Sequence, residues 1–416
     1  MSENILIIGA GIGGLAAALS LHEAGFPVQV FESVAELRPL GVGINLLPHA
    51  VREIEELALL PAIEAAGVSC KKLAYFTKRG EPIWAEARGL AAGYRWPQIS
   101  VHRGVLQRVL FDAARERLGD ARLKLGHQLL EVTAKERGVT ASFASGHRVT
   151  GRLLVAADGI HSAVRRGFHP GEGPPRWNGA VMWRGVVETS RLLDGHTMIM
   201  SGHTRQKFVC YPIVDLERDR QLINFVAELR GDVTELSERE DWNKPGALED
   251  FLPAFAGWRF DWLDVPGLIE AAGRTWVYPM VDRDPLPGWT RGPITLLGDA
   301  AHPMYPIGSN GASQAILDAR VLTGCLRHYR DDLEQGLLRY DQIRRDATAA
   351  IVLANRGQGP EIAMQLVEDR APNGFERLSD VIDENELQAI ADKYKRLAGF
   401  AVAELNDRAS LSEPTP

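Results

Sequence analysis

The chain has 416 residues, of which 45% are hydrophobic and 24% charged, a balance typical of a soluble globular protein with two or three domains. Its formal net charge of -7 argues against nucleic acid or an anionic membrane as the main partner. The three cysteines (Cys70, Cys210 and Cys325) lie far apart without a CxxC pair, so we expect neither a disulfide framework nor a metal site.

The beginning of the chain carries no recognisable targeting segment, because residues 1–4 contain no basic residue and lead directly into a short apolar run. No stretch of about eighteen uncharged apolar residues occurs, so no membrane-spanning helix is expected. With free cysteines favouring a reducing compartment, the sequence predicts a cytoplasmic protein.

The first expected element is a buried strand at 5–8, followed at once by GAGIGG and by a helix that ends near Gly25. A second apolar run at 28–31 ends in Glu32. This is the G-x-G-x-x-G motif in the strand, turn, helix, strand and acid context that dinucleotide binding requires. The motif by itself does not distinguish FAD from NAD.

Each glycine of this motif (Gly9, Gly11, Gly13 and Gly14) is expected to serve the backbone. Gly9 permits the sharp turn, Gly11 lets the backbone approach a pyrophosphate, and Gly14 lets the helix pack on the strand. The pyrophosphate would rest on the free N–H groups of the helix N-terminus, and Glu32 would accept hydrogen bonds from ribose hydroxyls.

Two further buried runs also end in an acid, LLVAAD at 153–158 and ITLLGD at 294–299. A carboxylate at the C-terminal end of a parallel strand points into the crevice where such sheets bind ligands. Taken singly, Asp158 could instead be a helix N-cap and Asp299 a strand-end acid facing water.

Together, the segments GAGIGG…E, ADGIHSAVR and LLGDAAHPMYPIGSNGAS resemble the class A flavin-dependent aromatic hydroxylases, the family of p-hydroxybenzoate and salicylate hydroxylases. The resemblance implies that the dinucleotide is FAD. It further implies that Gly298 and Asp299 hold the ribityl chain, that Asp158 serves both FAD and the nicotinamide nucleotide, and that Arg38 and Arg103 contact FAD.

The turn at 306–314 is expected to face the flavin. Gly308 and Gly311 free its backbone, and Ser309 or Asn310 would cap the helix that follows. The positive end of that helix would favour an anionic reduced flavin by about 0.3–2 kcal/mol. A plain capped helix is the alternative. The resemblance also places Pro303 close to the flavin, where oxygen adds.

Because the FAD segments lie at both ends of the sequence, we predict an α/β fold with a discontinuous Rossmann-like FAD-binding domain, an inserted, smaller mixed β-sheet substrate domain and C-terminal helices. The expected FAD-binding domain comprises 1–70, 98–176 and 284–355, the substrate domain 71–97 and 177–283, and the C-terminal segment 356–416. In the inserted pieces, short strands are expected at 72–77, 180–188, 197–201, 207–213 and 222–228.

The same pieces hold eight of the nine tryptophans, which suggests an aromatic-rich lid over a planar substrate, although most of these rings are expected to be plain core. Long helical patterns occupy 331–355 and 384–409, and the end of the chain, 410–416, is expected to be disordered.

The mechanism that the resemblance implies uses NADH or NADPH to reduce FAD, and O2 to form a flavin C4a-hydroperoxide that hydroxylates an aromatic ring in a dry pocket. Because there is no second G-x-G-x-x-G unit, the nicotinamide is expected to dock only transiently. Tyr211 is a candidate to polarise the substrate and Arg184 to pair with its carboxylate. For both residues a structural hydrogen bond is an equal alternative.

Further stretches resemble the pyocyanin-forming phenazine hydroxylases within this family: RPLGVGIN (38–45), HRG (102–104), DGIHSAVR (158–165), MWRG (182–185), YPMVDRDPLP (278–287), GASQAILD (311–318) and VLANR (352–356). They imply a small N-heteroaromatic, phenazine-like carboxylate as substrate, with or without loss of its carboxyl group, and a monomer or homodimer. Salicylate- or 3-hydroxybenzoate-type hydroxylation, a flavin reductase or oxidase that never hydroxylates, and a nucleotide-free binding protein remain alternatives.

Overall fold

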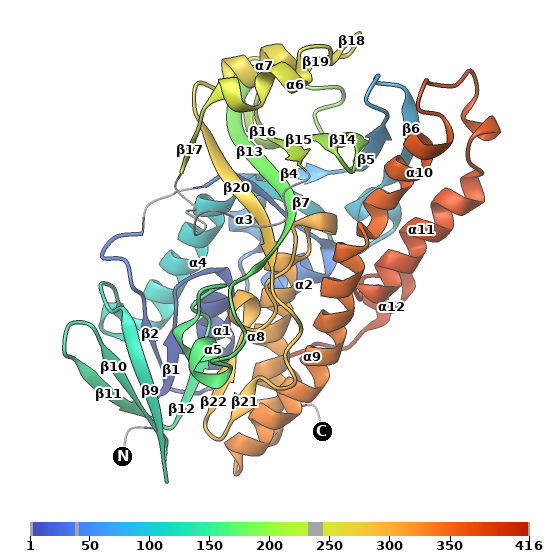
Figure 1. Ribbon diagram of the computed structural model, residues 1–416. Coiled ribbons are helices and arrows are strands. Elements are labelled where there is room, and N and C mark those ends of the chain that lie inside the picture. Colours follow the sequence, from blue (N-terminus) through green and yellow to red (C-terminus); the bar gives the residue numbers. More distant parts are fainter. Residues whose placement is uncertain (1–2, 38–40, 137, 232–243, 415–416) are drawn as a thin grey trace.

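The computed structural model describes residues 3–37, 41–136, 138–231 and 244–414. Two large β-sheets lie at opposite ends of the molecule, with long helices between and beside them (Figure 1). The predicted α/β architecture, with a Rossmann-like sheet, a mixed sheet and C-terminal helices, is confirmed.

The first sheet has the strand order β21-β22-β12-β1-β2-β8, and all of its pairs are parallel except β21 with β22. Its strands are β1 (Ile5–Ile8), β2 (Val28–Phe31), β8 (Leu123–Lys124), β12 (Leu153–Ala156), β21 (Thr290–Arg291) and β22 (Ile294–Leu296). β1 and β12 are buried along their whole length, as their uninterrupted apolar sequences predict for a sheet covered on both faces. The parallel order brings the C-terminal ends of β1, β12 and β22 to one edge.

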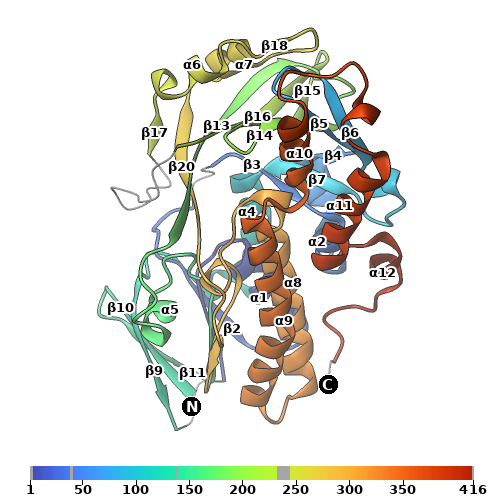
Figure 2. The same cartoon turned by 45° about the vertical axis from the view of Figure 1, so that its right-hand side comes forward.

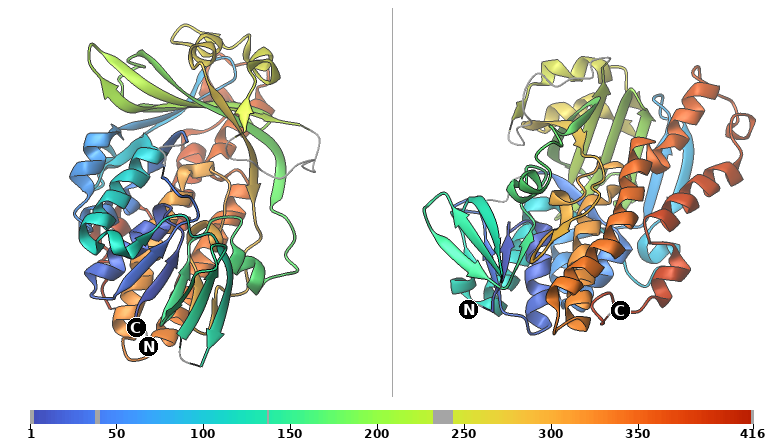
Figure 3. Two further views of the ribbon diagram at one scale, coloured as in Figure 1. Left: turned by 90° about the vertical axis from the view of Figure 1, so that its left-hand side faces the viewer. Right: turned by 60° about the horizontal axis from the view of Figure 1, so that its bottom comes forward.

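Helices cover one face of this sheet, and a small antiparallel sheet covers the other (Figure 3). The helices are α1 (Ile12–Glu23), α4 (Arg103–Leu118), α8 (Gly311–His328) and α9 (Leu333–Arg356). The small sheet consists of β9 (Leu129–Lys135), β10 (Gly138–Phe143) and β11 (Arg148–Gly151). It packs on the first sheet through Phe143, whose ring stacks on Phe31 with the centroids 4.7 Å apart.

The second large sheet has the order β17-β20-β13-β16-β15-β14-β5-β6. Its strands are β5 (Lys72–Phe76), β6 (Pro82–Ala87), β13 (Arg176–Ser190), β14 (Thr197–His203), β15 (Gln206–Leu216), β16 (Arg220–Arg230), β17 (Pro245–Gly246) and β20 (Thr275–Asp282). All five predicted strands are present, and β5 pairs parallel with β14, so the sheet is mixed as expected. The expectation of a smaller sheet is wrong, because long hairpins give it eight strands.

The outer face of the second sheet carries α6 (Leu252–Phe255) and α7 (Val265–Ala271) (Figure 2). Together they bury a separate hydrophobic core in which Trp183 stacks on Phe251 at 5.1 Å. Between the two large sheets lies a three-stranded sheet of β3 (Gly43–Leu46), β7 (Gln98–His102) and β4 (Gly67–Cys70), with α2 (Pro48–Glu56) and α3 (Leu60–Ala66) in the connection.

The C-terminal helices α10 (Ile362–Arg370), α11 (Glu384–Leu397) and α12 (Val402–Asp407) run along one side of the molecule (Figure 2). The predicted helical pattern at 384–409 is interrupted where Gly399 adopts a φ of 76°. The expectation of disorder from residue 410 is wrong for the described part, because Ser410 Oγ donates to Glu56 at 2.6 Å and Arg327 donates to the Ser412 carbonyl at 2.8 Å. Among the described helices, none combines the length and hydropathy needed to span a bilayer.

Candidate active site

A deep pocket with about 1470 Å³ of empty space, part of it at its open mouth, lies between the edge of the first sheet and the inner face of the second. Nine of the residues singled out from the sequence line it together: Gly11, Gly13, Arg103, Arg184, Tyr211, Gly298, Asp299, Asn310 and Gly311. They come from six separate segments of the chain, so the fold assembles one cavity from the predicted motifs.

The glycine turn divides into residues that pack and residues that face the pocket. Gly9 has a φ of 103°, and a Cβ there would lie 2.3 Å from the Ala157 carbonyl oxygen. A Cβ on Gly14 would lie 2.0 Å from the Gly9 carbonyl oxygen, so only glycine lets α1 sit this close to β1. At Gly11, in contrast, a Cβ would meet no atom within 4 Å, and this residue opens onto the cavity. No side chain caps α1, which leaves its first N–H groups available to an anion.

Glu32 stands beside this turn but is not part of the pocket wall. Its Oε2 accepts a hydrogen bond from the Ala10 N–H at 2.7 Å, and Oε1 accepts one from Val34 at 3.0 Å. The carboxylate therefore fixes the end of β2 against the glycine turn.

Asp158 also lies next to the pocket rather than in its wall, which its neighbours Ala157 and Gly159 reach. Its Oδ2 accepts from the Ala163 N–H at 2.8 Å, while Ser162 caps the short helix α5 (Ala163–Phe168). Burial raises the pKa of the Asp158 carboxyl, and hydrogen bonds to it from the Ser162 side chain and the Ala163 N–H oppose the rise. Asp158 thus supports the start of α5, but Ser162 and not Asp158 occupies the N-cap position, so the N-cap alternative is wrong. The buried Oδ1 of Asp158 has no partner in the described part of the chain.

Asp299 and Arg103 are the two charged groups that open freely into the pocket. Within the described residues, neither side chain makes a hydrogen bond or ion pair. Burial of the site raises the pKa of Asp299, and His302 and Arg103 oppose the rise. Both side chains are exposed to the solvent of the open pocket, so each is free to meet a ligand there. Hydroxyl groups would suit Asp299 and a phosphate would suit Arg103, and FAD carries both.

Asp318 is a residue that the sequence reasoning missed, although it lies in the GASQAILD stretch. Its Oδ2 accepts from the Gly298 N–H at 3.0 Å and lies 2.5 Å from His302 Nε2, and its Oδ1 accepts from Arg344 at 2.6 Å. Burial opposes ionisation, but His302 and Arg344 overcome it and lower the pKa of Asp318 to about 2. This ionised carboxylate holds the turn on which Asp299 stands.

The turn expected to face the flavin has the predicted glycine conformation, with a φ of 67° at Gly308. Asn310 occupies the N-cap position of α8, yet neither it nor Ser309 caps the helix with its side chain, so that expectation is wrong. Asn310 Nδ2 instead donates to the Tyr394 hydroxyl at 2.9 Å and to the Gly308 carbonyl at 3.2 Å. Because Asn310, Gly311 and Ala312 line the pocket, the uncapped N-terminus of α8 faces it.

Arg184 and Tyr211 lie together on the inner face of the second sheet. Arg184 Nη2 donates to the Gly43 carbonyl at 2.7 Å, and the guanidinium carbon lies 5.8 Å from the centre of the Tyr278 ring. Arg184 Nε is buried with no hydrogen-bond partner among the described residues. Burial raises the pKa of Tyr211, which Arg184 opposes. The pair offers a fixed cation and a neutral phenol to a substrate.

Two more predicted residues, Pro303 and Gly308, do not line this wall. Arg38 lies outside the described residues. Pro303 is buried, and the wall is formed there by Met304 and Pro306 instead. Gly308 instead lines a smaller neighbouring pocket, and a Cβ on it would lie 2.2 Å from the Tyr394 hydroxyl.

The apolar part of the wall is built from methionine rather than tryptophan. Of the seven methionines in the chain, five line the pocket: Met182, Met198, Met200, Met280 and Met304. None of the described tryptophans does, and Trp183 and Trp258 belong to the outer core instead. Trp242 lies outside the described residues. The predicted aromatic lid is therefore wrong for the described wall, which is soft and adaptable.

The wall also contains a buried charge cluster that no motif indicated. Lys207 Nζ lies 2.9 Å from Glu228 Oε2 and 2.5 Å from Glu361 Oε2. We call these three residues the Lys207 cluster. All three line the pocket, and their side chains are 9%, 5% and 6% exposed. With all three ionised, this part of the wall carries a net charge of one negative unit and disfavours a substrate anion.

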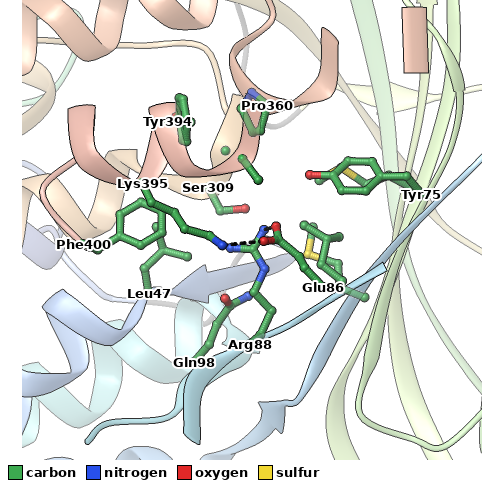
Figure 4. A pocket seen from close by; sticks show the side chains of 15 residues that line it. Leu47, Tyr75, Glu86, Arg88, Gln98, Ser309, Pro360, Tyr394, Lys395 and Phe400 are labelled. Carbon is green, nitrogen blue, oxygen red and sulfur yellow. Dashed lines mark hydrogen bonds and ion pairs between the residues drawn. The ribbon is translucent and has the colours of Figure 1, made fainter. Parts of the chain in front are cut away.

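A smaller side pocket, with about 420 Å³ of empty space that is partly open to solvent, adjoins the main one through Met198, Met200 and Ser309 (Figure 4). There Glu86 pairs with both Arg88 and Lys395, at 2.5 and 2.7 Å. This ion pair joins α11 to β6 directly behind the turn at Ser309.

The family model described as "FAD binding domain" matches residues 3–251 and 280–355. The chain is 45% identical to the phenazine 1,6-dicarboxylic acid hydroxylase PhzS of Lysobacter antibioticus, over 85% of this chain and 89% of that protein. It is 30% identical to 3-hydroxybenzoate 6-hydroxylase 1 of Aquipseudomonas alcaligenes, over 86% of this chain and 88% of that protein. Among solved structures, Klebsiella pneumoniae HpxO complexed with FAD and uric acid matches with a TM-score of 0.76 and 28% identity, covering 94% of this chain and 96% of that one. The chain therefore belongs to the FAD-dependent aromatic hydroxylases, as its motifs predicted, and FAD is its cofactor.

Proposed function

We propose that the protein hydroxylates an N-heteroaromatic, phenazine-like carboxylate with O2, using NADH or NADPH to reduce its FAD. One observation carries the proposal: a single pocket contains both the unpaired polar groups that suit FAD, Asp299 and Arg103, and an apolar wall in which the Arg184 guanidinium is held in place. The 45% identity to a phenazine dicarboxylate hydroxylase supports this class of substrate.

The residues at the sheet edge would hold the cofactor. The open N-termini of α1 and α8 suit its pyrophosphate and its pyrimidine edge, and Asp299 and Arg103 suit its hydroxyl and phosphate groups. Glu32 and Asp158 would contribute from the second layer, where they shape the turns that touch the ligand. When bound, FAD supplies the activation of O2 and the transfer of one oxygen atom.

The inner face of the second sheet would hold the substrate. Arg184 would pair with its carboxylate, since its Nη2 is already fixed by Gly43 and its Nε is left unpartnered. Tyr211 remains protonated near neutral pH, because burial raises its pKa, and would donate a hydrogen bond to a ring nitrogen or oxygen. The five methionines exclude water and adapt to a broad polycyclic ring.

Other features belong to the same proposal. Residues 1–70, 98–176 and 284–355 would act as the FAD-binding domain, 71–97 and 177–283 as the substrate domain, and 356–416 as a C-terminal support. The three cysteines are free and buried, which supports a reducing, cytoplasmic location. The oligomeric state within this proposal is a monomer or homodimer.

The proposal is tested with the purified, FAD-loaded protein and a panel of phenazine, quinoline, pyridine and benzoate carboxylates. NADH and NADPH oxidation is followed together with product mass. We expect stimulation and the gain of one oxygen atom, with or without loss of the carboxyl group, to be strongest for phenazines. If a salicylate or 3-hydroxybenzoate is turned over best, the alternative of a salicylate- or 3-hydroxybenzoate-type hydroxylase is favoured, and the 30% identical 3-hydroxybenzoate 6-hydroxylase keeps that alternative open. Nicotinamide oxidation without an oxygenated product from any ring would refute hydroxylation.

A further inference from the structure

Tyr394 of α11 reaches the flavin-facing turn from a part of the chain that the family model does not match. Its hydroxyl accepts a hydrogen bond from Asn310 Nδ2 at 2.9 Å and donates to Asn355 Oδ1 at 2.8 Å, with the Ile307 carbonyl at 3.2 Å as a second acceptor. The side chains of Asn310, Tyr394 and Asn355 are buried, at 0%, 6% and 1% exposure. Three helices therefore meet in one closed hydrogen-bond network.

The network also includes one residue of the VLANR stretch. Asn355 lies in that stretch, and its Nδ2 donates to the Tyr305 carbonyl at 3.1 Å, so it fixes the chain just before the turn. Gly308 completes the arrangement, because any side chain there would collide with the Tyr394 hydroxyl. The turn is thus shaped around that one hydroxyl group.

The consequence falls on Asn310. Asparagine is among the most effective N-caps, because its side-chain oxygen accepts from the first N–H groups of a helix. Here the side chain is committed elsewhere: Nδ2 to Tyr394 and to the Gly308 carbonyl, and Oδ1 to Gln314 Nε2 at 3.2 Å. The first amides of α8 consequently have no side-chain acceptor and carry the positive end of the helix dipole into the pocket.

The position of α11 is itself anchored next to this turn. Figure 4 shows Lys395, the neighbour of Tyr394, extending to Glu86 and Arg88 close to Ser309. The ion pair of Lys395 with Glu86 spans 2.7 Å, and the two side chains are only 16% and 7% exposed. The anchor holds Tyr394 against the turn without contacting the main pocket.

We propose that Tyr394 is a positioning residue for the flavin: its hydroxyl keeps the Asn310 side chain away from the first amides of α8, so that these amides remain available to the pyrimidine edge of the isoalloxazine. This rests on the proposed function only in that FAD occupies the pocket with that edge toward α8. The negative charge of reduced flavin gathers at this edge, so the amides favour the reduced form over the oxidised one.

The test is Tyr394→Phe, which removes the hydroxyl and keeps the ring. Asn310 then keeps its hydrogen bonds to the Gly308 carbonyl and to Gln314 Nε2. Without the hydroxyl to hold the turn, its backbone is free to leave the αR conformation (φ -93°, ψ -26°) for the extended one in which its side chain caps α8. Because an N-cap is worth about 1 kcal/mol, we expect the preference for reduced over oxidised FAD to fall roughly five- to tenfold. A tenfold loss lowers a two-electron potential by about 30 mV. The potential is measured by equilibration with a redox dye, and FAD affinity by fluorescence titration of the apoprotein.

Two further variants separate this role from a general packing defect. Asn310→Ala provides no capping oxygen, so adding Tyr394→Phe to it is expected to leave the potential of Asn310→Ala unchanged. Tyr94→Phe is the matched control: Tyr94 is also 6% exposed, belongs to the same hydrophobic cluster and donates to the Phe400 carbonyl at 2.6 Å, which lies outside the turn. We expect it to lower thermal stability without moving the potential.

A Tyr394→Phe protein that binds FAD with an unchanged potential would overturn the proposal. So would an equal shift in Tyr94→Phe, or a double variant whose potential falls below that of Asn310→Ala by the full Tyr394→Phe shift. A wild-type protein that binds no FAD would instead refute the proposed function, so the two failures are distinguishable.

Discussion

The Lys207 cluster allows a direct test, because one substitution removes the only cation that pairs with two buried carboxylates within the described residues. Replacement of Lys207 by Met keeps the length of the side chain but leaves Glu228 and Glu361, which are 5% and 6% exposed, without their partner. Removal of one partner from a buried ion pair costs about 3–5 kcal/mol. At about 2.1 cal/mol/K per residue, a chain of 416 residues loses about 3–6 °C of melting temperature for that cost.

The loss should also depend on pH. Burial already raises the pKa of Glu361, and Lys207 opposes the rise, so Lys207→Met raises that pKa further. A carboxyl whose pKa is higher in the folded than in the unfolded state stabilises the fold fully below its unfolded pKa, and this stabilisation is lost as the pH rises through the folded pKa. The deficit of the variant is therefore expected to be small near pH 5 and to grow toward pH 8.

Calorimetry of both proteins at matched FAD saturation, at half-unit steps from pH 5 to 8, measures this difference. Lys78→Met is the matched control, because Lys78 pairs with Glu368 at the surface with side chains 31% and 18% exposed. That variant is expected to lose less than about 1 kcal/mol, with little pH dependence. A Lys207→Met deficit below about 1 °C at pH 8, or one of equal size at pH 5 and pH 8, would refute the reasoning.

Three other variants test the remaining parts of the site. Gly14→Ala places a Cβ 2.0 Å from the Gly9 carbonyl oxygen and is expected to yield little folded protein in a thermal-shift assay. Gly11→Ala meets no atom within 4 Å, so it should fold normally but bind FAD at least tenfold more weakly by fluorescence titration. Equal folding of the two variants would contradict this prediction. The pKa of Asp318 is lowered to about 2, so its ionised carboxylate contributes about 2 kcal/mol of stability above pH ~4, and the wild type loses this stability between pH ~4 and 2. Asp318→Asn should abolish this contribution. An unchanged acid denaturation profile in the variant would contradict the prediction. Arg184→Met should lower kcat/KM by about 10–100-fold for carboxylated rings while the FAD content stays normal, and a similar loss with the decarboxylated analogues would exclude carboxylate pairing.

The sequence predicted correctly those parts of the fold that depend on residues adjacent in the chain. The alternation of strand, glycine turn, helix and acid identifies β1, α1 and β2, because a positive φ and a close backbone approach tolerate only glycine at Gly9 and Gly14. The buried runs before Asp158 and Asp299 were also predictable as strands, because a short apolar run of this length suits the interior of a parallel sheet.

Within the pocket, the sequence identified the residues whose chemistry belongs to a motif and missed those whose chemistry arises from pairing. Trp183 was a candidate lid residue, but the strand on which it lies turns it to the outer core, and the alternate residues Met182 and Arg184 face the cavity. Which face of a strand meets a ligand is set by the register of the whole sheet and not by its composition.

The sequence by itself therefore determined the family, the cofactor and the edge of the sheet at which we propose that FAD binds, since those depend on short motifs with fixed spacing. Tertiary structure alone decided the contacts between distant segments, such as Lys207 with Glu361, 154 residues apart, and Asn310 with Tyr394, 84 residues apart. No local period encodes such pairs, because each depends on how two separately formed elements pack. The same packing explains why Asn310, a residue suited to capping a helix, leaves the first amides of α8 open to the pocket.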